Sequence, residues 1–274
     1  MMGPVNKQIL LTASLYLSLY CPTINTGMRT IFLRILRVVL TLFIGAMVLM
    51  AAVLLQRVDP VQRKSAVPYT FADTLASMEF DLDSLKREIG SNKGLPEGYE
   101  EVAAIAYSAY PELRDAAIDM VLTQDGAPME SNFDLTTLLV PWKQRKYRIL
   151  LNDSPESYFD PILLRALPFD AQVGILAHEL GHVAYYDRLN VLQIAKWGLM
   201  YLWDDAFRAT HERTTDLMPV YHGLGSQIYQ YAYYVRKDSS CLAFYAAGKR
   251  FMDHYYMTDD ELLHVIRTTG TQGN

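Results

Sequence analysis

The sequence predicts an α+β domain preceded by an N-terminal membrane-spanning helix. Three observations support this fold class. Residues 38–55 form an uncharged apolar run, helix-like and strand-like periodicities follow one another along residues 70–274, and 51% of the 274 residues are hydrophobic against 20% charged. This is the composition of a globular protein with a sizeable core, so disorder of the whole chain is excluded.

Charge and cysteine content narrow the class of protein. Residues 1–63 carry a net charge of +5, whereas residues 64–274 carry −10. An acidic main domain lacks the basic face that binding to phosphates requires, so no nucleic-acid partner is expected. Cys21 and Cys241 are the only cysteines and lie in different parts of the chain, which predicts no disulfide framework.

The N-terminal leader, residues 1–56, contains a segment that can anchor the protein in a membrane. Residues 38–55 run for 18 positions without a charge, and at about 1.5 Å per residue they give about 27 Å of helix, close to one bilayer core. Arg29, Arg34 and Arg37 precede this span, so the positive-inside rule favours export of the residues from 56 onward. The expected location is a single-pass membrane anchor with an extracytoplasmic main domain.

Two alternatives to this topology stay open. Basic residues also follow the span, at Arg57, Arg63 and Lys64. By the positive-inside rule they favour the opposite orientation, in which the main domain is cytoplasmic. The other alternative is a cleaved signal peptide. The apolar run, however, continues past Ala51–Ala52 without a clean cleavage site, which favours an uncleaved anchor.

The boundaries of the remaining segments follow from composition. Residues 57–69 contain two prolines and predict a polar linker, and residues 70–274 form the main domain. Initiation at Met28 in place of Met1 would leave residues 1–27 outside the protein. No internal repeat or low-complexity tract is visible in the chain.

Hydrophobic periodicity predicts two helices at the start of the main domain. Apolar residues recur every three or four positions up to Ile89, which predicts an amphipathic helix opened by Thr70 with Asp73 three residues on. Residues 97–110 predict a second helix, which stops at Pro111.

Strands and further helices follow. Apolar residues alternate over 118–122 and again over 147–151, which predicts two half-buried strands. Residues 126–142 between them predict either another strand or a loop. From Phe169 onward the pattern is helical with short breaks, so a small sheet lies between two sets of helices, as in an α+β domain.

The run AQVGILAHELGHVAYY carries the chemistry. His178 and His182 are four residues apart, so they project about 40° from each other on one helical face and both imidazoles can reach one ion. Glu179 points about 100° round from His178, where it can act as general base on a water at the metal. This is the HExxH arrangement.

A bare HExxH also occurs by chance, and the alternative is an ordinary pair of solvated or hydrogen-bonded histidines. Apolar residues flank the motif on both sides. Gly174 and Gly181 lie inside the helix, where each glycine costs about 1 kcal/mol relative to alanine. Both features favour the functional interpretation, and the small residues predict a closely packed neighbour.

A tetrahedral catalytic zinc needs a third protein ligand and keeps its fourth position for water. The downstream candidates are Asp187, Asp204, Asp205, His211, Glu212, Asp216 and His222.

At this point the sequence resembles the zincin metallopeptidases of the gluzincin type. The metzincin pattern HExxHxxGxxH does not fit, because Tyr185 and Arg188 stand where it needs glycine and histidine. The gluzincin pattern takes its third ligand from a later ExxxD helix, and HERTTD supplies Glu212 and Asp216 at that spacing. The resemblance covers roughly residues 97–225 and looks closest to the small gluzincins.

The resemblance implies roles for these residues. Glu212 would be the third zinc ligand, and Asp216 would accept a hydrogen bond from the far nitrogen of a ligand histidine, with His178 as the expected donor. The alternative for Glu212 and Asp216 is an exposed helix face. Pro219 interrupts the ExxxD helix, which departs from the pattern.

The resemblance also bears on substrate binding. It implies that the strand Lys146–Asn152 offers its edge to an extended substrate backbone. Gluzincins commonly place a tyrosine or histidine opposite the base to stabilise the oxyanion. His222 is the candidate for this role, and Tyr221, Tyr229 and Tyr233 are the alternatives.

The expected function is zinc-dependent hydrolysis of peptide bonds in a peptide or protein substrate, by a domain held to the membrane through residues 38–55. A non-catalytic, membrane-anchored binding or assembly module with a structural metal is the main alternative, and a closed fourth coordination position would mark it. A di-iron helix bundle would need a second Glu-x-x-His motif, which is not evident.

Overall fold

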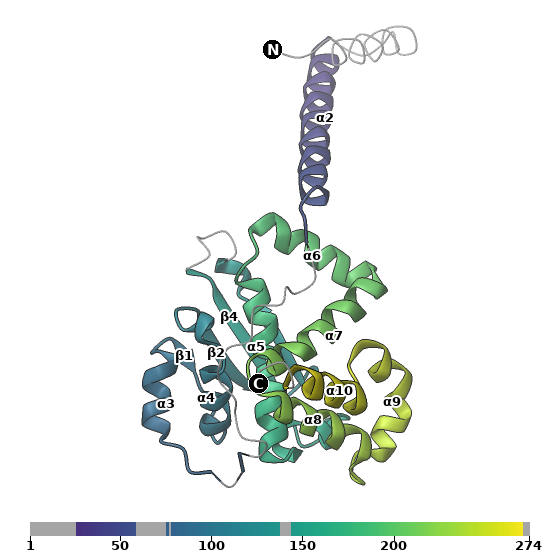
Figure 1. Cartoon of the computed structure of the whole chain (residues 1–274). Helices are drawn as coiled ribbons and strands as arrows, with labels where there is room; N and C mark the ends of the chain where they lie inside the picture. The colour runs from purple at the N-terminus through teal and green to yellow at the C-terminus, as the bar shows by residue number, and fades with distance from the viewer. Residues whose placement is uncertain (1–25, 59–74, 77, 138–143, 271–274) are drawn as a thin grey trace. The chain divides into compact units, whose positions relative to one another are not determined.

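The computed structural model describes residues 26–58, 75–76, 78–137 and 144–270, and the chain divides into two compact units, residues 1–55 and 56–274 (Figure 1). The first unit contains α2 (Thr26–Leu54). Within it, the 22 residues Leu33–Leu54 are long and apolar enough to cross a membrane. The predicted apolar helix is therefore confirmed, whereas residues 59–69 of the predicted linker lie outside the described residues.

The second unit is a mixed α+β domain, which confirms the predicted class (Figure 1). A small sheet and the helices next to it come first, and a helical half follows. The first half contains α3 (Leu82–Ile89), β1 (Lys93–Gly94), α4 (Glu100–Ser108), β2 (Ala117–Thr123), β3 (Met129–Phe133) and β4 (Lys146–Asn152). The second half contains α5 (Phe169–Tyr186), α6 (Val191–Trp203), α7 (Asp205–Tyr221), α8 (Gly225–Lys237), α9 (Leu242–Tyr255) and α10 (Asp259–Gly270).

The four strands form a mixed sheet in the order β1-β2-β4-β3. β4 pairs with β2 in parallel and with β3 in antiparallel orientation. Alternate residues of β2 and β4, such as Ile118 and Ile149, are fully buried on one face. Residues 129–133, which the sequence left open as strand or loop, form the edge strand β3.

This pairing corrects one expectation. Lys146–Asn152 is not an edge, because its backbone is hydrogen-bonded to neighbours on both sides. The edge beside the second half of the domain is β3, since it is the last strand in the sheet order. Unpaired backbone groups on an edge strand can accept an extended peptide, and β3 is the strand that offers them.

The predicted helix over 70–89 is also corrected. Residues 70–74 lie outside the described part of the chain, and α3 begins only at Leu82. The Asp81 side chain accepts hydrogen bonds from the backbone N–H groups of Asp83 and Ser84, which caps the helix at that point. The backbone N–H of Leu75 instead donates to Asp170, 2.8 Å away, and ties this segment to the start of α5.

The central helix of the domain is α5, which contacts α4, α7, α8 and β3. Its two internal glycines permit the closest of these approaches. A Cβ on Gly174 would lie 2.3 Å from the carbonyl oxygen of Gln227 on α8, and a Cβ on Gly181 would lie 3.0 Å from the Cβ of Met218 on α7. The prediction that small residues mark close neighbours is confirmed.

Gly174→Ala should therefore destabilise the domain by roughly 1–3 kcal/mol or more, because backbone atoms of α8 cannot move aside cheaply. The control is Gly198→Ala on α6, where a Cβ would meet nothing within 4 Å. That variant should be neutral or gain up to about 1 kcal/mol from helix propensity. Urea unfolding of the detergent-solubilised chain measures both free energies, and equal stability of Gly174→Ala and wild type would contradict the close packing.

Candidate metal centre

Three side chains from two helices converge at the centre of the domain. His178 and His182 extend from α5, and Glu212 extends from α7. The Oε2 atom of Glu212 lies 3.5 Å from His178 Nε2 and 3.4 Å from His182 Nε2. All three residues are buried, and their donor atoms lie within 4.8 Å of one another, so this group can hold a metal ion.

The two separations that involve Glu212 match those around a small tetrahedral ion. Zinc binds imidazole nitrogen at about 2.0–2.1 Å and carboxylate oxygen at about 2.0–2.2 Å, so two of its ligand atoms are about 3.4 Å apart. The two measured separations from Glu212 agree with this value. Two imidazoles and one carboxylate also suit other first-row divalent metals, so the group could hold a metal ion, and the donor set does not select one metal.

The turn between α6 and α7 delivers Glu212 to this position. Asp204 ends α6 and accepts a hydrogen bond from the backbone N–H of Phe207, 2.9 Å away, which caps α7. From this start, Glu212 and Asp216 lie on the face of α7 that packs on α5, and only 4% and 5% of their surfaces are exposed. The alternative of an exposed helix face is thereby excluded.

Asp216 lies behind His178, as the ExxxD resemblance implies. Its Oδ1 atom is 2.9 Å from His178 Nδ1, although the ring N–H is not aimed squarely at the oxygen. Its Oδ2 atom accepts a hydrogen bond from the backbone N–H of Met257, 2.7 Å away. Asp216 therefore connects the metal group to the turn that joins α9 and α10.

His211 takes the corresponding place behind His182. Its Nε2 atom lies 3.2 Å from His182 Nδ1, and its ring is fully buried among aromatic side chains. Burial lowers the pKa of His211 to about 3, and the neighbouring His182 acts in the same direction. A neutral His211 can accept a hydrogen bond from His182 Nδ1, which leaves His182 Nε2 free to bind a metal.

The electrostatics of the group favour binding of a cation. Burial alone would lower the pKa of His178, but the carboxylates of Asp216 and Glu212 outweigh it and hold the pKa well above its usual value. Burial would likewise raise the pKa of Glu212, whereas His182 and His178 hold it well below its usual value. Without a metal, a proton on His178 offsets part of the negative charge of the buried carboxylates.

Glu179 lies next to this group and is held from the edge strand. The Oγ atom of Ser131 on β3 lies 2.6 Å from Glu179 Oε2 and 2.9 Å from the backbone oxygen of Glu179. Sequence reasoning missed Ser131, because a serine in a segment of unclear structure gives no signal of its distant partner. Its contact with Glu179 spans 48 positions of the chain.

A cavity of about 740 Å³ opens beside the group. His178, Glu179, His182 and Glu212 all line it, and the edge strand β3 borders it. Tyr201 also lines it and donates a hydrogen bond of 2.6 Å to the second oxygen of Glu212. The donor group therefore faces a space large enough for part of a peptide or a similar ligand.

The structure does not bring His222 to this cavity. Its ring stacks on Tyr110 at 4.1 Å between centroids, its Nδ1 atom lies 2.8 Å from the backbone oxygen of Met218, and its Nε2 atom lies 3.2 Å from Glu112. His222 is the residue at which α7 ends, so its side chain turns back against that helix. The expectation that His222 stabilises an oxyanion is not supported by this position.

Other tyrosines reach the cavity instead. Tyr221, Tyr229 and Tyr233 are not among its lining residues, whereas Tyr231 and Tyr256 are. The Tyr256 ring lies 6.1 Å from the His178 ring, and burial raises its pKa well above the usual value, so its hydroxyl stays protonated and can donate. Only the packing of the α9–α10 turn against α5 and α7 places this residue.

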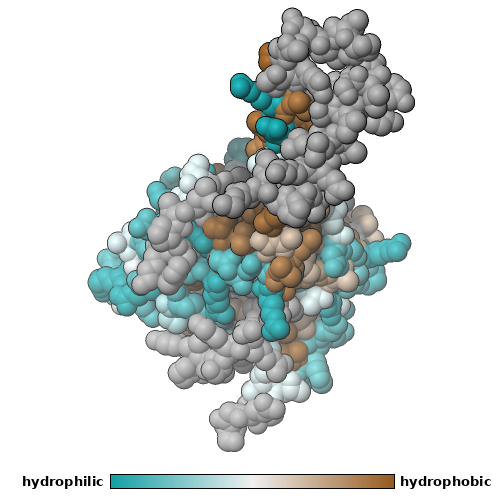
Figure 2. Space-filling model, turned by 90° about the horizontal axis from the view of Figure 1, so that it is seen from above, coloured by the Kyte–Doolittle hydropathy of each residue, from teal (hydrophilic) through white to brown (hydrophobic). Residues whose placement is uncertain are grey.

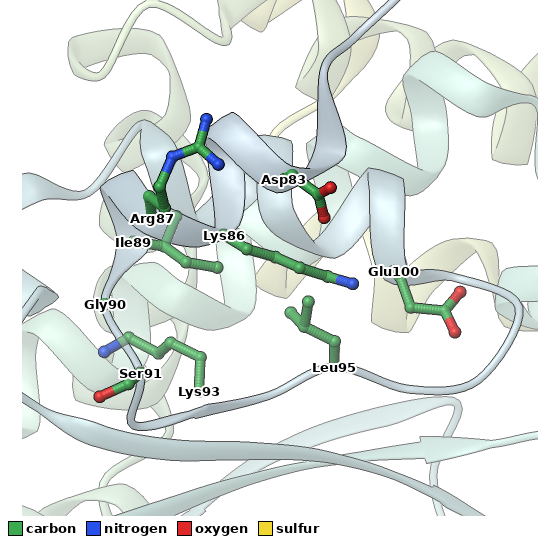
Figure 3. A pocket seen from close by; sticks show the side chains of 9 residues that line it. All are labelled: Asp83, Lys86, Arg87, Ile89, Gly90, Ser91, Lys93, Leu95 and Glu100. Atoms are coloured by element: carbon green, nitrogen blue, oxygen red, sulfur yellow. The ribbon is translucent and has the colours of Figure 1, made fainter.

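A second hollow lies between α3 and the segment leading to α4 (Figure 3). Side chains of both charge signs line it, including Lys86, Lys93 and Glu100. Burial lowers the pKa of Lys93 to about 8, and its ammonium group donates to the backbone oxygens of Arg114 and Ala116. Those bonds hold the chain together locally, so this hollow shows no comparable chemistry.

Comparison of the chain with protein-family models, with curated proteins and with solved structures finds no match in any of the three. No relative therefore supplies a ligand, a substrate or a reaction for this site. Its chemistry has to be inferred from the donor group, the neighbouring carboxylate and the cavity.

Metal binding should release about one proton at neutral pH, because a ligand imidazole must be deprotonated and His178 holds a proton in the metal-free protein. The apparent affinity for zinc should rise about tenfold per pH unit while the pH stays below the pKa of His178, and it should level off above that pKa. Calorimetry in two buffers with different ionisation enthalpies measures the released proton.

The matched control is Asp216→Asn, which removes a carboxylate that raises the pKa of His178. This variant should release fewer protons per bound zinc ion at the same pH. An affinity that does not change with pH in the wild-type protein would contradict the charge arrangement described above.

Proposed function

We propose that this protein is a membrane-anchored, zinc-dependent peptidase with a zincin-like, gluzincin-type active site. The observation that carries the proposal is the placement of Glu179. Its buried carboxylate lies beside the group of His178, His182 and Glu212, and all four residues line the same cavity. A general base next to three metal ligands and an open space is the arrangement that metal-assisted hydrolysis requires.

Zinc would be held by His178 Nε2, His182 Nε2 and Glu212 Oε2, and the two separations from Glu212 fit its bond lengths. When bound, it supplies Lewis acidity, polarising the carbonyl of the scissile bond and acidifying water. Asp216 and His211 would fix the orientation of the two histidines from behind. Tyr201 would hold the second oxygen of Glu212 and keep one oxygen for the metal.

Glu179 would move the proton of the reaction. Its carboxylate accepts a proton from the attacking water and passes it to the leaving nitrogen, so that the carbon–nitrogen bond breaks into a carboxylate and an amine. Ser131 binds Glu179 Oε2 and so holds the carboxylate in one orientation. The edge strand β3 borders the cavity and would pair with the extended substrate backbone.

Tyr256 is the best-placed oxyanion partner. It lines the cavity next to His178 and keeps its phenolic proton. A donor of this kind lowers the barrier only if it meets the charge that develops on the carbonyl oxygen. Tyr256 replaces His222 in this role because His222 is occupied by Glu112 and the end of α7.

The rival function is a non-catalytic module with a structural metal. Structural zinc sites are usually closed by four protein ligands. Here three donors converge among the described residues, and the cavity lies beside them. An intact carboxylate at Glu179, held by its own serine, has no use in a structural site. The open cavity and this carboxylate favour catalysis.

The anchor completes the proposal. The uncharged part of the candidate span, residues 38–54, would cross the bilayer once, and Arg29, Arg34 and Arg37 before it favour an extracytoplasmic main domain. A C-terminal reporter that works only outside the cytoplasm tests this orientation, and activity of a cytoplasm-specific reporter would reverse it without affecting the chemistry.

Glu179→Gln should abolish peptide hydrolysis while the zinc content stays at about one per chain. The amide keeps the size and shape of the side chain but cannot take a proton, and loss of a general base typically costs about 10² to 10⁴ in rate. The measurement is cleavage of a quenched-fluorescent peptide library, with zinc determined in the same samples. His182→Ala is the comparison, because it should lose zinc and activity together.

Two outcomes would count against the proposal. Comparable cleavage by wild type and Glu179→Gln at equal zinc would remove Glu179 as the base. An inactive wild type with full zinc would favour the structural-metal module instead.

Tyr256→Phe should reduce the turnover number by about 10² to 10³, because it removes one oxyanion donor. Zinc content and KM should change little, since the ring remains in place. Tyr233→Phe on α8 is the matched control, because Tyr233 does not line the cavity. Unchanged turnover in Tyr256→Phe would assign the oxyanion to another group.

A further inference from the structure

Helix α6 is an apolar helix that the rest of the domain covers only in part, because most of its residues are half-buried whereas Ala195, Leu202 and Trp203 are exposed. Within its sequence VLQIAKWGLMYLW, only Gln193 and Lys196 carry an amide or a charge. Ile194 is the one buried residue of this helix. At its C-terminal end, Leu202 is 72% exposed and Trp203 is 76% exposed. Two neighbouring large apolar side chains that are exposed to this extent are suited to contact with a membrane or another protein.

The pictures place this surface on one side of the main domain. In Figure 1, α6 lies at the upper side of the domain, and α8 lies at the lower side. Figure 2 looks down on the upper side and shows hydrophobic residues gathered within a hydrophilic surround.

The polar side chains of α6 bind the segment that leaves the membrane span. Lys196 donates a hydrogen bond to the backbone oxygen of Gln56, and Gln193 donates one to the backbone oxygen of Arg57. Gln56 follows the last residue of the candidate span, Leu54, by two positions. Because a chain reaches at most about 3.6 Å per residue, the two contacted backbone oxygens lie no more than about 11 Å along the chain from the end of the span.

We propose that α6 lies in the interface of the lipid bilayer into which α2 inserts, with Leu202 and Trp203 in contact with lipid. The proposal rests on the membrane anchor of the proposed function but not on the peptidase chemistry. Tryptophan and tyrosine favour the headgroup region, and lysine can keep its ammonium group in water while its stem lies along apolar surface. A helix of this composition binds in the plane of the interface.

The tether favours lipid over a protein partner. The contacts of α6 with Gln56 and Arg57 are made two and three residues after the candidate span, so the chain itself keeps α6 close to lipid. Asp204 and Asp205 follow directly after Trp203, and the Asp205 side chain is 63% exposed. Carboxylates are costly in the hydrocarbon region, so they limit the depth of α6 to the interface.

Docking of α6 would also orient the cavity. Trp197, Gly198, Tyr201 and Leu202 of α6 line it. Leu202 thus belongs both to the cavity rim and to the exposed apolar surface. The rim on this side would lie at the bilayer surface, open to polypeptide segments held near the membrane.

The test is fluorescence of Trp203 in the full chain reconstituted into phosphatidylcholine vesicles. Some vesicles carry bromine on the acyl chains close to the headgroups, where it quenches nearby tryptophans. The chain has three tryptophans, so the difference between wild type and Trp203→Phe isolates the signal of Trp203. This signal should fall by about half or more in brominated vesicles if the residue lies in the interface.

Two further variants serve as controls. Tyr233→Trp in the Trp203→Phe background places a tryptophan on α8, at a site that is 45% exposed. Its fluorescence should respond to aqueous acrylamide and not to brominated lipid. Leu202→Glu, with Trp203 retained, should reduce the lipid quenching of Trp203 severalfold, because a carboxylate opposes interfacial binding.

Three results would overturn the proposal. The first is that Trp203 fluorescence is unaffected by brominated lipid in a chain that still floats with vesicles after alkaline washing. The second is that neither brominated lipid nor acrylamide quenches Trp203, which would show that a second copy or another protein covers α6. A chain that fails to float would lack the tether. Peptidase activity plays no part in any of these readouts, so they are distinguishable from failure of the proposed reaction.

Discussion

Two imidazoles and two carboxylates are buried together between α5 and α7, and the main domain is arranged around the need to satisfy them. An ion removed from water costs several kcal/mol unless it is paired and hydrogen-bonded. Glu212 therefore faces both His178 and His182, and Asp216 faces His178 from behind. A bound cation would complete this balance of charge, which links metal binding to folding.

The surrounding structure supplies the remaining hydrogen bonds. Tyr201 donates a hydrogen bond to the second oxygen of Glu212, and the backbone N–H of Met257 donates one to the second oxygen of Asp216. These partners come from α6 and from the turn between α9 and α10, so the helices after the HELGH helix are needed to complete the site. Gly174 and Gly181 let α8 and α7 approach closely enough for this to happen. The close packing of the helices and the hydrogen bonding of the buried carboxylates therefore depend on each other.

Access to the site is decided at its borders. On one side, the edge strand β3 presents Ser131 to Glu179 and leaves a row of backbone groups next to the cavity. On another side, α6 contributes to the cavity wall and carries the exposed pair Leu202 and Trp203. Under our two proposals, the substrate backbone would pair with β3. The substrate would enter the cavity beside α6, the helix that lies on the membrane.

The sequence by itself determined the features that depend on local spacing. Residues four apart on a helix share a face, so the partnership of His178 with His182 and that of Glu212 with Asp216 were readable before any fold was known. The apolar span was readable from its length without a charge, and the strands were readable from the alternation of apolar residues. The third donor, Glu212, was predicted from the resemblance of HERTTD to the gluzincin ExxxD pattern, because local spacing alone left several downstream candidates.

Only the tertiary structure decided which distant groups meet. Ser131 reaches Glu179 across 48 positions, His211 lies behind His182, and Tyr256 rather than His222 enters the cavity. Sheet order likewise made β3 the edge instead of Lys146–Asn152. Contacts of this kind depend on how helices and strands pack, and a periodic pattern records only which face of an element is buried, not which neighbour covers it.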